Sequence, residues 1–297
     1  MLKNLKSNLI LLLAAVIWGF AFVAQKVGME HVGPFTYNGV RFILGAASLV
    51  PVFMLLEREY DKSRLWYTVK TAAATGVALF LAANLQQVGI VDIDSVGKAG
   101  FLTGIYTVLV PIIEVVIFRA RSRWNIWSGA ILALVGLFCI SFFDTFSFSS
   151  ADLTVILSSL MFAVQIIMVD RFSDRIYPIK FSCVQFLTCG ILSMSVALFT
   201  EDISISGILS GSLPILYGGL CSVGIAYTLQ IVGQKNTNPT AAAIILSTES
   251  VFGLLGGALL RGEKLSALAI FGCFLVFSGI VLSQLPDKKA AGTNNKT

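Results

Sequence analysis

Ten apolar runs dominate the chain, and each is long enough to cross a membrane. They cover approximately residues 8–27, 35–56, 68–88, 96–118, 124–142, 152–170, 179–199, 213–232, 239–260 and 265–285. A helix needs about 20 apolar residues to cross the hydrocarbon core of a bilayer. Of the 297 residues, 56% are hydrophobic and 12% charged, whereas a soluble domain has about 25% charged residues. The sequence therefore predicts an all-α integral membrane protein with ten transmembrane helices, whose surroundings are a lipid bilayer.

The distribution of basic residues predicts the orientation of these helices. An even number of helices places both termini on one side of the membrane. With the N-terminus inside, 16 Lys and Arg residues lie in cytoplasmic segments and three, Lys26, Arg261 and Lys264, lie in outer segments. Such an excess is typical of cytoplasmic loops. We therefore expect both termini in the cytoplasm, with residues 286–297 forming a disordered tail. The net charge of +5 lies in short clusters between apolar runs, which does not suggest a nucleic-acid partner.

An internal repeat divides the chain into two halves. The segment LQQVG at 85–89 returns as LQIVG at 229–233, and PFTYNGVRF at 34–42 aligns with PIKFSCVQF at 178–186. Trp18 aligns with Phe162, and two glycine pairs align at nearly the same offset: Gly129 and Gly136 with Gly272 and Gly279. Five helices are an odd number, so the second half must enter the membrane in the opposite sense. We predict two inverted five-helix repeats, residues 1–143 and 144–285, with a substrate site between them near the midplane.

Glu249 is the strongest candidate for that site, because it lies near the middle of span 239–260 and has no polar partner on its own helical face. An acid at this depth costs about 2.5–3.5 kcal/mol on insertion scales. It is either a proton carrier, a counter-charge for a cationic substrate group, or a structural acid bonded to another helix. Tyr106 is its repeat partner, so symmetry places both on a central cavity unless the tyrosine only packs against helices or lipid. Trp18, in the middle of the first span, is expected to form a cavity wall or to pack between helices.

Six further polar residues complete the predicted substrate-binding set: Asn84, Gln87, Gln86, Gln230, Lys98 and Arg41. Asn84 and Gln87 share a helical face. Gln86 and Gln230 are either polar residues at helix ends or symmetric vestibule residues, and the following Gly89 and Gly233 suit helix C-caps.

Lys98 either extends to the membrane surface or attracts anionic substrates, and Arg41 either pairs with an outer acid or acts as a gate. Gln165 and Tyr227 rank lower as site candidates. Glu114 is expected to form an interfacial ion pair with Arg119 or Arg121.

Four segments resemble the EamA-type drug/metabolite transporters: WGFAFV at 18–23, GKAGFLTGIYTVLVP at 97–111, TESVFGLLGGALLRGEKLS at 248–266 and GCFLVFSGIVL at 272–282. The resemblance implies a ten-helix transporter of a bacterial inner membrane, in a family with many exporters of amino acids and other small metabolites. Two positions differ from the family pattern. Arg119-Ala120-Arg121 replaces the usual Gly-Glu of the first half, and Ser250 replaces a proline, so the resemblance predicts no proline kink at 250.

The sequence lacks the G-x-x-x-x-G-K-[ST], H-E-x-x-H and G-x-S-x-G motifs, and its single histidine cannot anchor a metal cluster. We therefore predict no enzyme activity, no metal and no cofactor. The predicted function is secondary transport without ATP, as an exporter of small metabolites such as amino acids or amines, by alternating access around a midplane cavity. A membrane sensor or assembly protein that does not transport, and a lipid-group flippase, are the alternatives. The sequence leaves coupling to protons and a homodimer open.

Overall fold

The computed structural model describes residues 2–58, 60–93, 95–120, 123–141, 149–262 and 265–285. Within these ranges every regular element is helical, and ten helices are long and apolar enough to cross a membrane. The prediction of an all-α membrane protein with ten transmembrane helices is confirmed.

The first half contains five spans. They are α1 (Leu2–Gly28), α2 (Pro34–Leu56), α3 (Lys62–Val91), the broken span α4 (Val96–Gly104) with α5 (Tyr106–Val116), and α6 (Trp124–Ser141). Pro34 occupies the first turn of α2, where proline's missing N–H costs nothing. The Asp61 side chain caps the start of α3 by accepting a hydrogen bond from the backbone N–H of Arg64 at 2.8 Å.

The second half repeats this plan. Its spans are α7 (Ser150–Phe172), continued by the 3₁₀ turn η1 (Ser173–Arg175); α8 (Pro178–Thr200); α10 (Ser212–Leu216) with the π-helix η2 (Tyr217–Tyr227) and α11 (Thr228–Gln234); α12 (Pro239–Leu246) with α13 (Glu249–Arg261); and α14 (Ala267–Gln284). The short helix α9 (Ile205–Ser210) lies between α8 and α10. Prolines again begin α8 and α12.

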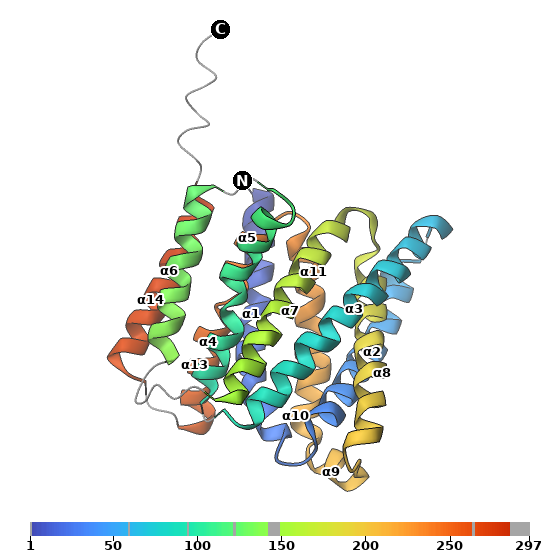
Figure 1. The fold of residues 1–297 in the computed structure, drawn as a ribbon. Helices are drawn as coiled ribbons and strands as arrows, with labels where there is room; N and C mark the ends of the chain where they lie inside the picture. The colour runs from blue at the N-terminus through green and yellow to red at the C-terminus, as the bar shows by residue number, and fades with distance from the viewer. Residues whose placement is uncertain are drawn as a thin grey trace.

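Equivalent helices of the two inverted halves pack against each other. Helix α2 lies beside α8, and α6 lies beside α14 (Figure 1). Glycines allow the second pair to approach closely: a Cβ atom at Gly129 would lie 2.6 Å from the carbonyl oxygen of Gly279, and one at Gly136 would lie 2.6 Å from that of Gly272. The glycine repeat seen in the sequence is therefore the contact surface between these two helices.

The start of α1 and the end of α14 lie at the same end of the bundle (Figure 1). The side-chain amide of Asn8 donates a hydrogen bond of 3.0 Å to Oε1 of Gln284. An even number of crossings requires this arrangement. The predicted tail, residues 286–297, lies outside the described residues.

The fourth and ninth spans are broken at equivalent positions. Ile105 separates α4 from α5, and Ser247 and Thr248 separate α12 from α13. The hydroxyl groups of Ser247 and Thr248 donate to the carbonyl oxygens of Ile244 and Ile245, at 2.8 and 2.7 Å. These bonds engage backbone acceptors at the end of α12, where the span is interrupted without a proline.

Two glycines that were expected to end helices lie inside them. Helix α3 continues past Gly89 to Val91, and α11 continues past Gly233 to Gln234. A Cβ atom at Gly89 would lie 2.5 Å from Cγ2 of Val155, and one at Gly233 would lie 2.8 Å from Cγ of Leu11. The prediction that Gly89 and Gly233 act as helix C-caps is wrong. These glycines instead make room for a neighbouring helix.

Candidate functional site

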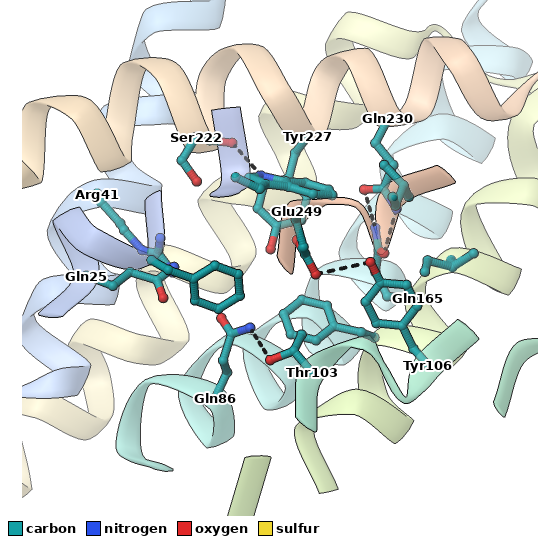
Figure 2. A pocket seen from close by; sticks show the side chains of 15 residues that line it. Gln25, Arg41, Gln86, Thr103, Tyr106, Gln165, Ser222, Tyr227, Gln230 and Glu249 are labelled. Atoms are coloured by element: carbon teal, nitrogen blue, oxygen red, sulfur yellow. Dashed lines mark hydrogen bonds between the residues drawn. The ribbon is translucent and has the colours of Figure 1, made fainter. Parts of the chain in front are cut away.

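A small cavity lies between the two halves and is lined by residues of both (Figure 2). Its volume is about 30 Å³, enough for about two water molecules. This conformation is therefore too contracted to hold a metabolite. The lining residues are Trp18, Phe22, Gln25, Arg41, Gln86, Thr103, Tyr106, Phe162, Gln165, Ile166, Ser222, Tyr227, Gln230, Leu246 and Glu249.

Two broken helices meet in this cavity through one hydrogen bond. Tyr106 is the first residue of α5 and Glu249 the first residue of α13. The Tyr106 hydroxyl donates to Oε1 of Glu249 at 3.1 Å (Figure 2). The side chains are only 3% and 5% exposed, and no basic residue in the described ranges forms an ion pair with Glu249. The repeat partners identified in the sequence are thus direct contacts, and the acid's partner belongs to another helix.

Arg41 contributes the second charge of the cavity. It is 1% exposed, and its Nη1 has no hydrogen-bond partner among the described residues. The expected pairing with an outer acid is wrong for the residues that the structure describes, since their ion pairs do not include Arg41. Its guanidinium carbon instead lies 5.2 and 5.1 Å from the ring centroids of Tyr37 and Phe42, where cation–π attraction partly compensates burial.

A chain of hydrogen bonds holds the Nε edge of the Arg41 guanidinium group. Arg41 Nε donates to Asn38 Oδ1 at 2.8 Å, and Asn38 Nδ2 donates to Asn84 Oδ1 at 3.0 Å. Asn84 Nδ2 in turn donates to the Ser193 hydroxyl at 2.7 Å. Asn84 therefore acts through Asn38 on the position of Arg41, and it does not line the cavity.

Trp18 lies on the cavity wall between an aromatic ring and an irregular helix. Its indole N–H donates to the carbonyl oxygen of Ser222 at 3.1 Å, and its ring centroid lies 4.5 Å from that of Tyr227 in an edge-on arrangement. Ser222 belongs to the π-helix η2. Such π-helical segments occur frequently at functional sites.

Glutamine side chains lie on opposite sides of Glu249 (Figure 2). The amides of Gln165 and Gln230 donate to each other at 3.4 and 3.1 Å. On the other side, Gln86 Nε2 donates to the Thr103 hydroxyl at 3.0 Å. Each of these contacts joins two helices of the same half: α7 with α11, and α3 with α4. A vestibule role for Gln86 and Gln230 stays a prediction.

Two more predicted site residues lie away from the cavity. The Lys98 ammonium lies 2.8 Å from both carboxylate oxygens of Asp152, whose side chain is 1% exposed. Gln87 is fully buried, and its side-chain amide has no hydrogen-bond partner within the described part of the chain. Glu114 pairs with Arg171 at 3.2 Å and not with Arg119 among the described residues, and Arg121 lies outside the described residues. Substrate binding by Lys98 and Gln87 stays a prediction that this geometry does not favour.

Other lining residues were missed or ranked low. Gln25 lies two helical turns after Trp18, so the spacing could have placed it on the same face. Thr103 lies three residues before Tyr106, a spacing that also places two side chains on one helical face. Nothing in the sequence identifies Ser222 as a residue of the cavity. Among the described residues, no group of three or more His, Cys, Asp or Glu side chains is placed to hold a metal ion.

Inverted halves, broken helices and a polar cavity where they meet define the architecture of a secondary transporter. Comparison with known proteins agrees with this class: the chain belongs to the EamA-like transporter family, whose model matches residues 5–142 and 149–285. It is therefore a multi-pass membrane protein of a transporter family.

Similar proteins cover nearly the whole chain. One named "Uncharacterized transporter" from Archaeoglobus fulgidus is 30% identical over 95% of this chain and 87% of its own length. YwfM of Bacillus subtilis, an "uncharacterized transporter", is 25% identical over 95% of both chains. YedA of Escherichia coli, an "uncharacterized inner membrane transporter", is 23% identical over 91% of this chain and 88% of its own. A solved structure entitled "Crystal structure of protein" has the same fold, with a TM-score of 0.76 and 17% identity over 94% of this chain and 96% of that one.

Proposed function

We propose that this protein exports small metabolites, such as amino acids or amines, across a bacterial inner membrane without using ATP. The observation that carries the proposal is the hydrogen bond between Tyr106 and Glu249 inside the contracted cavity. It joins the repeat-related broken helices of both halves at the place where transporters of this architecture bind substrate.

Alternating access follows from the contracted volume. A cavity of about 30 Å³ must widen before it can take up a metabolite, so one half, residues 1–143, moves against the other, residues 144–285. The Tyr106–Glu249 hydrogen bond joins the two halves and must break when they separate, whereas the Gln165–Gln230 and Gln86–Thr103 contacts each lie within one half. A single hydrogen bond is weak enough to break and reform during a transport cycle.

Glu249 is the proposed counter-charge for a substrate amine and the proposed carrier of a coupling proton. An ionised carboxylate is costly in a site without a basic partner, and a substrate cation or a proton relieves that cost. Tyr106 and Tyr227 are the titratable groups of the cavity beside it, and Arg41 is the cavity's basic group. Substrate and proton would therefore exchange at the same carboxylate.

The test is exchange in vesicles that contain the purified full-length protein. Vesicles are loaded with an unlabelled amino acid or amine, and entry of the same labelled compound is measured across a panel. Glu249→Gln keeps the size and an oxygen acceptor for Tyr106 but removes the ionisable group. We expect exchange to fall about tenfold or more. In vesicles prepared without internal substrate, net substrate uptake should raise the internal pH with the wild-type protein and leave it unchanged with the variant.

The matched control is Glu30→Gln, which makes the same chemical change at an exposed position outside the cavity and should retain full exchange. Wild-type exchange that is unaffected by Glu249→Gln would contradict the role of this carboxylate. Absence of exchange for the whole panel would contradict export of amino acids or amines. Scrambling of labelled lipid without solute exchange would instead establish a flippase.

A further inference from the structure

Arg41 carries a buried charge that the described protein does not neutralise. Its side chain is 1% exposed, its Nη1 has no hydrogen-bond partner, and no carboxylate of the described residues forms an ion pair with it. A buried arginine is costly unless an anion pairs with it. The missing partner is therefore expected to arrive from outside the protein.

The surroundings of Arg41 leave one edge of the guanidinium for such a partner. Asn38 holds the Nε edge through the chain of hydrogen bonds to Asn84 and Ser193, while the rings of Tyr37 and Phe42 lie near the guanidinium. Arg41 also lines the central cavity (Figure 2). A guanidinium held in this way offers a planar pair of donors that matches a carboxylate.

The same cavity presents an opposite charge at Glu249, and the two charges together restrict the substrate. A simple amine would satisfy Glu249 but would share the cavity with an unpaired cation at Arg41. A simple carboxylate would satisfy Arg41 but would share it with the carboxylate of Glu249. A molecule carrying both an ammonium and a carboxylate satisfies both residues at once.

We propose that Arg41 binds the substrate carboxylate while Glu249 binds its amine, so that the transported compounds are zwitterions. This inference rests on the proposed function and narrows it. The remaining lining residues carry no charge, and five are apolar or aromatic without a hydroxyl: Trp18, Phe22, Phe162, Ile166 and Leu246. A substrate with a third charged group would find nothing in the cavity to pair with it. The substrate class is therefore a zwitterion whose remaining part is uncharged.

The proposal is tested by binding of matched probes to purified full-length protein, measured by titration calorimetry. Leucine is the zwitterion, leucinamide lacks the carboxylate charge, N-acetylleucine lacks the amine charge, and lysine adds a third charge. Alanine and 4-aminobutyrate, each with its amide and its N-acetyl derivative, extend the series to a smaller side chain and a longer charge separation. Exchange of the labelled zwitterions in vesicles is measured in parallel, so that transport and charge preference are tested separately.

We expect at least one zwitterion to bind about 30-fold or more tightly than its amide and its N-acetyl derivative, and leucine to bind more tightly than lysine.

Arg41→Gln should remove the preference for the zwitterion over its amide, while changing the affinity for the amide less than about threefold. Arg41→Lys keeps the charge but loses the forked donors, so its preference should be intermediate. Glu249→Gln should remove the preference over the N-acetyl derivative. Arg64→Gln, an arginine outside the cavity, should change neither.

Zwitterion exchange together with an unchanged zwitterion-to-amide ratio in Arg41→Gln and Arg41→Lys would overturn this inference and leave the proposed transport intact. Wild-type protein that exchanges an amine but no zwitterion would do the same. Wild-type protein that neither binds nor exchanges any probe would overturn the proposed function, and this inference with it. Comparable thermal stability of the variants excludes loss of fold as the cause of any change.

Discussion

Four charged side chains in the membrane-spanning helices fall into two groups, those with and those without an ion-pair partner among the described residues. Lys98 and Asp152 lie on different spans and pair with each other, and Asp152 also accepts the backbone N–H of Ser149 at 2.8 Å to cap α7. Arg41 and Glu249 face the cavity and form no ion pair within the described residues. A charge with a partner in the protein stabilises the helix contact, whereas a charge without one is available to a ligand. We therefore infer a structural role for Lys98 and propose Arg41 and Glu249 as the charged groups of the site.

This distinction predicts the effect of removing Lys98. Lys98→Met leaves the 1% exposed carboxylate of Asp152 without its cation. We expect the free energy of unfolding to fall by about 1–3 kcal/mol, less than for a fully buried pair, because the lysine side chain is 22% exposed. The double variant with Asp152→Asn should recover part of the loss, because both charges are then removed. Unfolding in detergent micelles measures both values, and equal losses in the single and double variants would contradict the pairing.

At the scale of helices, both halves place a left-handed residue at equivalent positions after the fourth span, although the residue type differs. Gly262 follows α13 with φ of 69°, and Arg119, its partner at an offset of 143 residues, has φ of 51°. Both values are left-handed, a conformation that glycine adopts freely and that costs other residues about 1–2 kcal/mol. The first half therefore keeps the left-handed conformation at this position with an arginine, at the cost of local backbone strain.

Opposite substitutions at these two positions should have opposite effects. No atom lies within 4 Å of the place that a Cβ at Gly262 would occupy, so Gly262→Ala tests backbone conformation without steric overlap. We expect it to lower the free energy of unfolding by about 1 kcal/mol and Arg119→Gly to raise it by up to about 1 kcal/mol. Gly97→Ala is the control, because its Cβ would lie 3.6 Å from the nearest atom within a helix. Equal behaviour of all three variants would show that the left-handed caps are not strained.

The helices could be predicted from the sequence more completely than the breaks within them. Apolar run length and the glycine repeat sufficed for ten spans in two halves, because the bilayer fixes how long a helix must be. At the break, the hydroxyls of Ser247 and Thr248 donate to their own helix. The same residues also occur in unbroken helices, so the sequence alone does not locate it.

The candidate site, like the helix breaks, could be predicted only in part from the sequence. Repeat symmetry placed Tyr106 and Glu249 together, because equivalent positions of inverted halves meet at the axis between them. Symmetry could not separate Gln86, which lines the cavity, from its neighbour Gln87, which does not. Their separation depends on how α3 is rotated against its neighbours. Repeat symmetry also could not predict the ion pair between Lys98 and Asp152, which are 54 residues apart.

At the scale of the whole molecule, topology and charge can be combined. The contact between Asn8 and Gln284 shows that the first and last helices meet at one end of the bundle. The sequence assigns 16 of the chain's 21 Lys and Arg residues to segments that an even number of spans predicts for that side. Cytoplasmic segments retain such an excess because positively charged loops are not readily translocated. We therefore infer that this end faces the cytoplasm, which defines export as movement away from it.

Reporter fusions in a bacterial host test this orientation. Green fluorescent protein fused to either terminus should fluoresce, because it folds in the cytoplasm, while alkaline phosphatase fused there should be inactive. Alkaline phosphatase inserted after Ile203, in the loop between α8 and α9 at the opposite end of the bundle (Figure 1), should be active. Termini on different faces would contradict an even number of crossings and with it the inverted repeat. Both termini outside would preserve the fold but reverse the inferred orientation, so that the segments richest in Lys and Arg would face outward against the charge rule.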